Sequence, residues 1–448
     1  MKLHRFVKFF IFTVFLISNT CAQFSAYHGI VFPYDGPNKV IHSIGSITYA
    51  FPDPSADVQN NPVGLSFIQH PQIFINLSQD ISKYYISISQ KISKYFISRY
   101  SNILDGTEES KTLPVNYSFY PEFFSVALPV NVFKRKCVFA GSINKILSPE
   151  HEVWLEMNEN YANLNFNHQR EGNVYNAALG LCYQLAPNIN VGIGWNKWFG
   201  HWSWYDENIS KTIYCHGHFD YYGNNFNLGL LSQYQDLSVC FIFHFPFTLM
   251  KAENIFLNLQ KQSKKYNMQQ HFNGAFKAGV AYRLNNRMSL SAGYRFQGTA
   301  SKKQMETDSY NHEIREEYDV SHQISIASEY ILNLKNSKLP IFLACWVNWI
   351  PETMFRSYYG NVNYLALGYQ IFSIGNNIGP VYNIAFGFNV PLSSVILHFT
   401  GQWYLNSING LTSDATPGAA RWSPVYFEAK KSTFMINVGI SHVLKSVK

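Results

Sequence analysis

One short run of residues has side chains that could hold a metal ion. Cys215, His216 and His218 place a thiol and two imidazoles close together, and these groups are the usual protein ligands of zinc. A structural zinc site takes four ligands, and no second pair lies nearby in the sequence. We therefore predict an outer loop at this point, with no metal bound there or elsewhere and no cofactor.

The sequence offers no catalytic pattern. Residues 306–317 gather several acidic side chains around Arg315, which suits a solvated loop better than a pair of catalytic carboxylates. Neither the Gly-x-Ser-x-Gly spacing of a nucleophile elbow nor the His-Glu-x-x-His spacing of a zinc protease occurs. We predict that the protein is not an enzyme.

Apolar and polar side chains alternate along many runs of the sequence, which predicts β-strands. Any functional site must therefore be positioned by strands. Between Met288 and Gln297 one face has Met, Leu, Ala, Tyr and Phe, and the other has Ser, Gly, Arg and Gln. A strand points successive side chains to opposite faces. The pattern recurs in about 14 runs, near 71–90, 118–130, 136–147, 173–186, 189–201, 223–234, 237–247, 271–284, 287–299, 319–333, 339–349, 378–390, 393–405 and 430–444.

The connections between these runs alternate in length. Tight turns such as 187–188 and 285–286 follow one run, and long stretches such as 202–222 or 248–270 follow the next. This alternation is typical of an outer-membrane barrel, which has short periplasmic turns and long outer loops. The composition agrees, since 17% of the residues are aromatic and only 14% are charged, against about 25% charged in soluble domains. A β-sandwich with a ring-filled core is the alternative.

Tryptophans gather near the outer ends of two runs. Trp195, Trp198 and Trp202 lie together on one, and Trp346 and Trp349 on another. Aromatic rings at the headgroup level anchor membrane barrels. We therefore interpret these residues as parts of an outer girdle.

The N-terminus predicts export. Three basic residues precede the apolar stretch 9–17, and the small residues Thr20, Cys21 and Ala22 follow it. This order is typical of a secretory signal peptide, so we predict cleavage after residue 22 and a location in the outer membrane of a bacterium.

The next segment, 23–70, differs from the alternating runs that follow. It contains five prolines, alternates poorly and is too short for a domain. We predict that it forms an N-terminal plug in the lumen, and that residues 71–448 form the transmembrane antiparallel β-barrel of about 14 strands.

Charge and cysteine content limit the partners. The formal net charge is +7, and we find no basic cluster, so we predict no nucleic-acid partner. The five cysteines that remain after cleavage are scattered, which argues against a disulfide framework.

Two motifs in the predicted plug resemble a known family. Asp53-Pro54-Ser55-Ala56 and Asn61-Pro62-Val63-Gly64-Leu65 are similar to the plug of the long-chain fatty acid transporter (FadL-like) outer-membrane proteins, with Val63 in place of the usual alanine. The stretch 276–296 resembles the recurring hairpin of that family. The family barrel has fourteen strands, which equals the number of alternating runs.

The resemblance implies passive outer-membrane transport of hydrophobic compounds, such as long-chain fatty acids or aromatic hydrocarbons. The ligand would be captured at outer loops, held in an apolar pocket and released sideways through the wall. It also implies a monomer that contacts outer-membrane lipid and lipopolysaccharide and depends on the barrel-assembly machinery. The alternative is a structural or type IX secretion accessory role, which some FadL-like barrels serve.

The resemblance also assigns roles to residues. Asn61, Pro62, Gly64 and Leu65 would hold the conformation of the plug, and Phe24 would contact ligand. Gly141, inside the third run, would mark a strand kink, with packing against the plug as the alternative.

Four charged residues lie on or near polar strand faces: Lys277, Arg283, Arg295 and Glu329. They would either bind a carboxylate headgroup or pair as lumen charges with one another or with the plug.

Overall fold

The computed structural model describes residues 48–52, 55–87, 111–112, 118–147, 166–208, 214–257, 262–298, 300–306, 313–318, 320–334, 337–349, 353–356, 375–378, 381–414 and 423–444. Within these residues, a closed antiparallel barrel of 14 spans is formed. The barrel closes because the first strand, β1 (Gln72–Ser87), pairs with the last strand, β21 (Ser423–Val443). The predicted fold class is thereby confirmed for the barrel.

Most spans are single strands, and the others consist of two strands in line. The single strands are β1, β3 (Ser118–Val132), β4 (Arg135–Leu147), β5 (Phe166–Ala186), β6 (Ile189–Asn208), β7 (Tyr214–Tyr234), β20 (Val395–Asp414) and β21. The divided spans are β8 (Leu237–His244) with β9 (Phe247–Leu257), β10 (Gln262–Phe272) with β11 (Ala275–Asn285), β12 (Met288–Gln297) with β13 (Ala300–Glu306), β14 (Glu313–Tyr318) with β15 (Ser321–Leu334), β16 (Ser337–Trp349) with β17 (Thr353–Arg356), and β18 (Gly375–Ile378) with β19 (Val381–Leu392). A short strand, β2 (Lys111–Thr112), pairs with β1.

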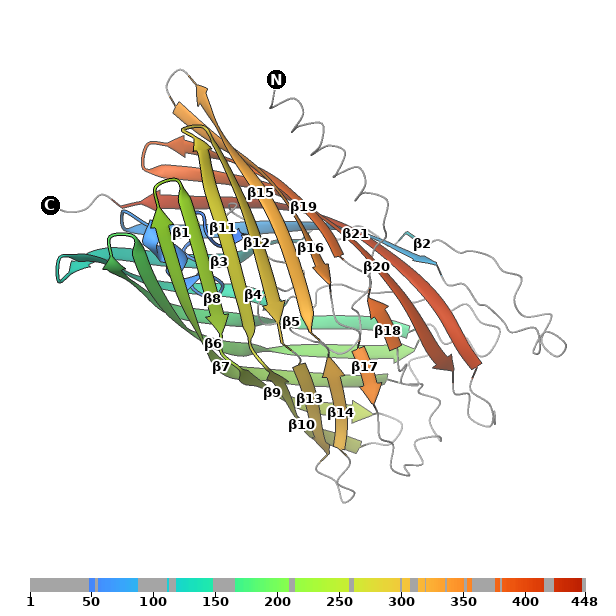
Figure 1. Cartoon of the computed structure of the whole chain (residues 1–448). Helices are drawn as coiled ribbons and strands as arrows, with labels where there is room; N and C mark the ends of the chain where they lie inside the picture. The colour runs from blue at the N-terminus through green and yellow to red at the C-terminus, as the bar shows by residue number, and fades with distance from the viewer. Residues whose placement is uncertain are drawn as a thin grey trace.

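Short turns join neighbouring spans at the end of the barrel where the C-terminus lies, and β9, β10, β13 and β14 lie toward the opposite end (Figure 1). In the turn between β3 and β4, Phe133 and Lys134 have φ of 49° and 62°. Two positive φ values are what a type I′ hairpin turn requires. The alternation of short and long connections therefore sorts the two ends of the barrel as the sequence predicts.

Much of the chain predicted as long loops is strand. The stretch 202–222 belongs largely to extensions of β6 and β7, which pair with each other from Ile189 to Glu207. The stretch 248–270 forms most of β9 and β10, which also pair. In both stretches the strand pairing extends beyond the alternating runs that the sequence shows.

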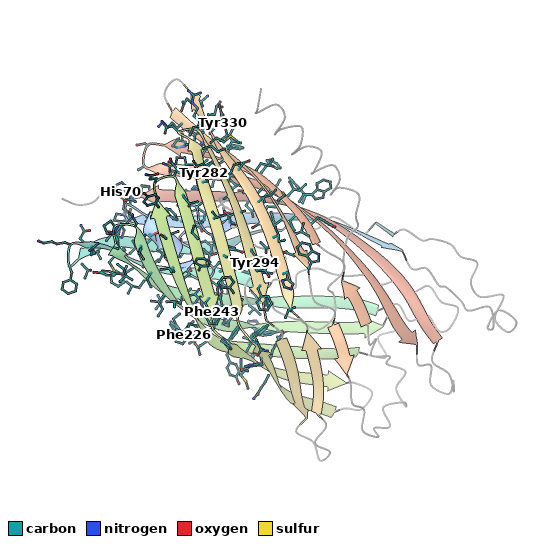
Figure 2. The ribbon with its side chains drawn as sticks, in the orientation of Figure 1. His70, Phe226, Phe243, Tyr282, Tyr294 and Tyr330 are labelled. Carbon is teal, nitrogen blue, oxygen red and sulfur yellow. The ribbon has the colours of Figure 1, made fainter. Side chains whose placement is uncertain are left out.

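The outer face of the barrel is apolar. Side chains that point outward include Phe226, Phe243, Tyr282, Tyr294 and Tyr330, which stand on the outside of β7, β8, β11, β12 and β15 (Figure 2). Their exposed fractions lie between 38% for Tyr294 and 50% for Phe226. Such a belt suits contact with lipid. No helix among the described residues is long and apolar enough to cross a membrane.

The inner face is buried and carries both polar and apolar side chains. It carries asparagine, serine and glutamine at alternate positions, among them Asn176, Asn196, Ser291, Gln323 and Asn437. The tryptophans divide between the faces: Trp195 and Trp349 are exposed, but Trp198 and Trp346 are buried and point inward. The interpretation of these last two as girdle residues is therefore wrong, because each lies on the opposite strand face from its exposed neighbour.

The divided spans are interrupted along one line across neighbouring strands. Two residues separate β8 from β9, and the same number separates β10 from β11. Gly274 adopts a φ of 93° at its break. On β7 the ladder shifts, since Asn227 pairs with His244 but Gly223 pairs with Leu249. This bulge reverses the alternation, so that Phe247 and Leu249 are buried on the inner side.

Candidate functional site

The motif from Asn61 to Leu65 forms one 3₁₀ helix, η1 (Pro62–Phe67), on the inner side of the barrel wall. Asn61 caps it: its Oδ1 accepts a hydrogen bond from the Gly64 backbone N–H at 2.9 Å. Its Nδ2 donates to the Tyr49 carbonyl at 2.9 Å. Pro62 suits the first position of the helix, since it lacks the N–H that would stay unpaired there. The motif therefore closes a compact loop between residues 49 and 64.

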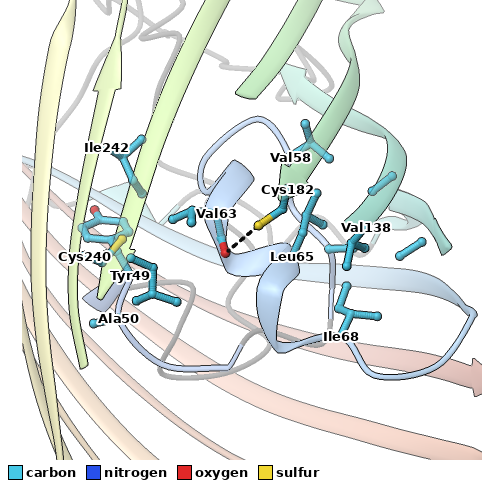
Figure 3. Packing of buried hydrophobic residues seen from close by; sticks show 14 of the residues in the cluster. Tyr49, Ala50, Val58, Val63, Leu65, Ile68, Val138, Cys182, Cys240 and Ile242 are labelled. Carbon is cyan, nitrogen blue, oxygen red and sulfur yellow. Dashed lines mark hydrogen bonds between the residues drawn. The ribbon is translucent and has the colours of Figure 1, made fainter. Parts of the chain in front are cut away.

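Gly64 and Leu65 complete this loop. A Cβ at residue 64 would lie 2.8 Å from Asn61 Nδ2, so glycine leaves room for the capping side chain. Leu65 is fully buried in a cluster that also contains Val58, Val63 and Ile68, and the wall residues of β4, β5 and β8 surround it (Figure 3). Cys182 of β5 lies 3.8 Å from the Val63 carbonyl in this cluster.

Glycines on the wall make room for this segment, residues 48–52 and 55–68, which we call the lumen segment. A Cβ on Gly192 of β6 would lie 2.5 Å from the backbone of Pro62 and Val63, and one on Gly180 of β5 would lie 2.5 Å from Val58. The same collision arises at further glycines of the inner face, namely Gly194, Gly229 and Gly279. We call the inner faces of β4–β8 and β11 the seat wall, because the lumen segment fits against them only where side chains are missing.

Polar side chains of the wall form hydrogen bonds with the lumen segment at several points along its length. Asn227 Nδ2 donates to the carbonyls of Val58 and Gln59, at 2.9 and 2.6 Å. Lys136 Nζ donates to the Ser66 carbonyl at 2.7 Å. On β3, the Ser125 hydroxyl donates to the Ser55 carbonyl. These three wall side chains hold the segment through its backbone carbonyls.

Two of the four predicted lumen charges come together. Lys277 of β11 and Arg295 of β12 are direct partners in the ladder, and both are buried on the inner face. Lys277 Nζ donates to Asn60 Oδ1 at 3.0 Å and lies 5.2 Å from the centre of the Tyr49 ring. Lys277 therefore contacts the lumen segment, and the roles predicted for the four charges stay predictions.

The other two charges lie nearer the short turns. Arg283 is exposed, and Arg283 and Glu329 both pair with Ser289 in their ladders, so that one strand separates them. They do not join Lys277 and Arg295.

The remaining predicted residues are placed as follows. Gly141 lies in β4 within ladders to β3 and β5 that run past it without a register shift; the nearest shift is at Lys145/Leu147. The register thus gives no support to a kink at Gly141. Phe24, the signal peptide and most of segment 23–70 lie outside the described residues, so the plug as a whole stays a prediction.

The Cys215–His218 stretch is strand rather than loop, since it lies in β7. Within it, the structure describes the side chain of His218, whose ring nitrogens lie 2.9 Å from Ser203 Oγ and 3.1 Å from Asp220 Oδ1. Among the side chains that the structure describes, no three of His, Cys, Asp and Glu are grouped as a metal would require.

An aromatic group on the inner face was not predicted. Trp198 of β6 stacks on Phe247 of β9 with ring centres 6.0 Å apart, and Phe247 stacks on Phe272 of β10 at 4.9 Å. Asn225 of β7 orients the first ring, since its Oδ1 accepts from Trp198 Nε1 at 2.9 Å. All three rings are buried, and we call them the ring shelf.

Strand parity and one proline could have revealed the ring shelf. Trp198 lies three residues from the outward Trp195, so the two must point to opposite faces. Phe247 shares the parity of the outward Phe243 and Phe245, and only the interruption at Pro246 turns it inward. Proline inside a strand marks a bulge or an edge.

Comparisons with known proteins show the fold. No protein-family model and no curated protein matches the sequence. The structure resembles that of a FadL homologue from Pseudomonas aeruginosa, with a TM-score of 0.60 and 11% identity over 88% of this chain and 95% of that one. It resembles the toluene transporter TodX of Pseudomonas putida, with a TM-score of 0.53 and 11% identity over 92% and 99%.

A third similar structure is the toluene transporter TbuX of Ralstonia pickettii, with a TM-score of 0.51 and 9% identity over 92% of this chain and 99% of that one. At these identities the likeness establishes a shared barrel fold over nearly the whole chain.

Proposed function

We propose that this protein is an outer-membrane channel of the FadL-like kind, which lets hydrophobic molecules cross passively. Long-chain fatty acids and aromatic hydrocarbons are the candidate cargoes. A molecule captured at the outer loops passes to the ring shelf, rests above the lumen segment and leaves sideways through the wall. No chemical step is involved.

The ring shelf is the observation that carries this proposal. The inner face has three stacked aromatic rings on β6, β9 and β10. Burying a Phe-sized apolar surface is worth about 1.5–3 kcal/mol, which is enough for weak capture and easy release. The shared fold supports the same function, because two of the similar structures are toluene transporters.

The interruption between β8 and β9 is the exit that we propose. The ladder between the spans is broken at residues 245–246 and 273–274, so fewer hydrogen bonds hold the wall there. Phe247 and Phe272 are the first strand residues beyond the break. On the outside, Phe243 and Phe245 contact each other with centres 5.0 Å apart, and so an apolar surface lies on each side of the wall.

The location follows from the same features. An apolar belt around a closed barrel suits a membrane, and strand-built spans with short turns at one end suit the outer membrane of a bacterium. We propose export through a signal peptide over residues 1–22, assembly by the barrel-assembly machinery, and a monomer in contact with lipid and lipopolysaccharide.

Uptake by cells with and without the gene tests this function. Labelled toluene and a labelled long-chain fatty acid are each given to both strains, and we expect faster uptake of at least one when the barrel is present. Equal uptake of both would overturn the proposal and favour a secretion accessory.

Paired variants then locate the path. Phe247→Ala and Phe272→Ala should slow uptake, because each removes a ring of the shelf. Phe241→Ala and Phe276→Ala make the same change on the outer faces of the same two spans, and they should leave uptake unchanged at equal amounts of folded protein.

A further inference from the structure

Two buried asparagines lie beside the ring shelf. Asn176 of β5 and Asn196 of β6 point inward and are 1% and 0% exposed. In the ladder between β5 and β6, Asn176 lies opposite Trp198 and Asn196 lies opposite Ala178. The two amides are therefore diagonal neighbours on one face, and Asn176 is directly across from the first ring of the shelf.

Neither amide has a hydrogen-bond partner among the described residues. The side-chain oxygen and nitrogen of both Asn176 and Asn196 are buried and unbonded. Buried polar groups in folded proteins are nearly always hydrogen-bonded, because leaving them without a partner costs free energy. A pair of such amides on adjacent strands therefore has unused capacity for both donation and acceptance.

Neighbouring amides show what a satisfied inner asparagine looks like. Asn225, opposite Asn196 on β7, accepts from Trp198. Asn227, two residues further along β7, donates to the lumen segment. Asn176 and Asn196 lie between these contacts, just beyond the height at which Val58 packs over Gly180 and Gly194. The two free amides thus stand where the ring shelf meets the lumen segment.

We propose that Asn176 and Asn196 bind the polar end of a neutral amphiphile whose flat apolar body lies on the ring shelf. An amide donates through its NH₂ and accepts through its oxygen, which matches a hydroxyl or a carbonyl group. It supplies no charge to offset the desolvation of an ionised carboxylate. The buried cations among the described residues lie on other strands: Lys145 on β4, Lys277 on β11 and Arg295 on β12. Lys277 contacts Asn60 of the lumen segment. The cargo class is therefore an uncharged alcohol, phenol or ketone, and this proposal rests on the proposed function.

Three probes that share one apolar body test the inference: 2-methylnaphthalene, 2-naphthalenemethanol and 2-naphthoate. Their binding is measured on full-length protein in lipid vesicles, with protein-free vesicles subtracted. We expect the alcohol to bind about tenfold more tightly than the hydrocarbon, which corresponds to hydrogen bonds with two buried amides. The carboxylate should bind more weakly than the alcohol.

The variant Asn176→Leu/Asn196→Leu should weaken binding of the alcohol about tenfold, while the hydrocarbon binds as before or more tightly. Asn190→Leu is the matched control, because it makes the same change on the same inner face of β6, nearer the short turn. It should leave all three affinities unchanged. If the double variant fails to assemble, each single variant should weaken alcohol binding about threefold.

The outcomes separate the two proposals. Undiminished alcohol binding in the variants, or tightest binding of the carboxylate by the natural protein, overturns the amide site. Loss of hydrocarbon and alcohol binding together would also overturn it, since the amides would then only support the fold. If the natural protein binds the hydrocarbon in any of these cases, the transport function stands. If it binds none of the probes, both proposals fail.

Discussion

Two walls of this barrel fill their interior in different ways. The seat wall leaves glycines free of side chains and is filled by the lumen segment, which lies against Gly180, Gly192 and Gly194. The wall that closes the barrel, formed by β19, β20, β21 and β1, is filled mainly by its own side chains, and Phe51 of the lumen segment packs against a cluster that includes Ala385 of β19. We call it the seam wall.

On the seam wall, side chains from adjacent strands pack against one another and fill the interior. Phe74 is fully buried and lies where a Cβ on Gly439 would meet its ring at 2.9 Å. The same ring contacts His398, with centres 5.3 Å apart, and the two ring nitrogens of His398 lie 2.9 Å from Asn389 Oδ1 and Ser441 Oγ. The seam wall therefore stabilises the barrel, whereas the seat wall depends on a separate stretch of chain that could be displaced without opening the sheet.

The largest effect is expected on the seam wall. Phe74→Ala removes a fully buried ring and leaves a cavity, which costs about 3–5 kcal/mol in the free energy of unfolding. Urea unfolding in lipid vesicles measures this loss. The control is Phe139→Ala, which removes an outward ring that is 48% exposed and should cost less. If Phe74→Ala also released the lumen segment to protease before the barrel unfolds, the two walls would not be independent.

Gly192→Val tests the seat wall. Its Cβ would collide with the backbone of Pro62 and Val63, and overpacking of this kind costs about 1–3 kcal/mol. We expect the lumen segment to absorb this cost by moving away, so that ion conductance across a planar bilayer rises while the midpoint of urea unfolding changes little.

Gly141→Val is the matched control for that variant. A Cβ there would lie 3.4 Å from Leu179 Cδ2 and in ordinary contact with its next neighbour, so conductance should stay at the natural level. An unchanged conductance in Gly192→Val would show that the seat tolerates a side chain and would remove the contrast between the walls.

The sequence alone was sufficient to predict the features that recur in every span. Alternation over each span predicts the strands, because every span must face lipid on one side and a polar interior on the other. The motif from Asn61 to Leu65 was singled out by its resemblance to a known family, and the structure shows why particular residue types stand there: Asn61 caps the helix and Pro62 begins it.

Features that depend on distant contacts were not found. In the sequence, Gly192 and Gly180 are glycines inside strands, where glycine is normally destabilising. Their role is clear only when the lumen segment is seen to pack against them. Asn176 and Asn196 look like any polar inner residues, because only the structure shows which amides have partners. The ring shelf was missed because one interruption at Pro246 reverses the face of the residues that follow.

A smaller effect is expected at the cap of η1. Asn61→Ala removes the bond to Gly64 and the bond to the Tyr49 carbonyl, and loss of a cap costs about 0.5–2 kcal/mol. Asn61→Asp keeps the hydrogen-bond acceptor but loses the donor. Its lumen segment should therefore be cleaved by protease at a rate between those of the natural protein and of Asn61→Ala. The rate at which a protease cleaves the lumen segment in intact barrels measures this order of stability. Equal rates for both variants would mean that the contact with Tyr49 alone matters.

The smallest effect concerns the end of η1. Lys136 Nζ donates to the Ser66 carbonyl at 2.7 Å, and a cation near the last carbonyls of a helical turn is favourable. A single bond of this kind contributes about 0.5–1.5 kcal/mol. In Lys136→Met we therefore expect faster hydrogen exchange at the Ile68 amide, which donates to the Leu65 carbonyl in the same turn. Lys134→Met, in the exposed turn, should leave this exchange unchanged. Equal exchange in both variants would mean that the packing of Leu65 and Ile68, rather than the lysine, holds this end of the segment to the seat wall.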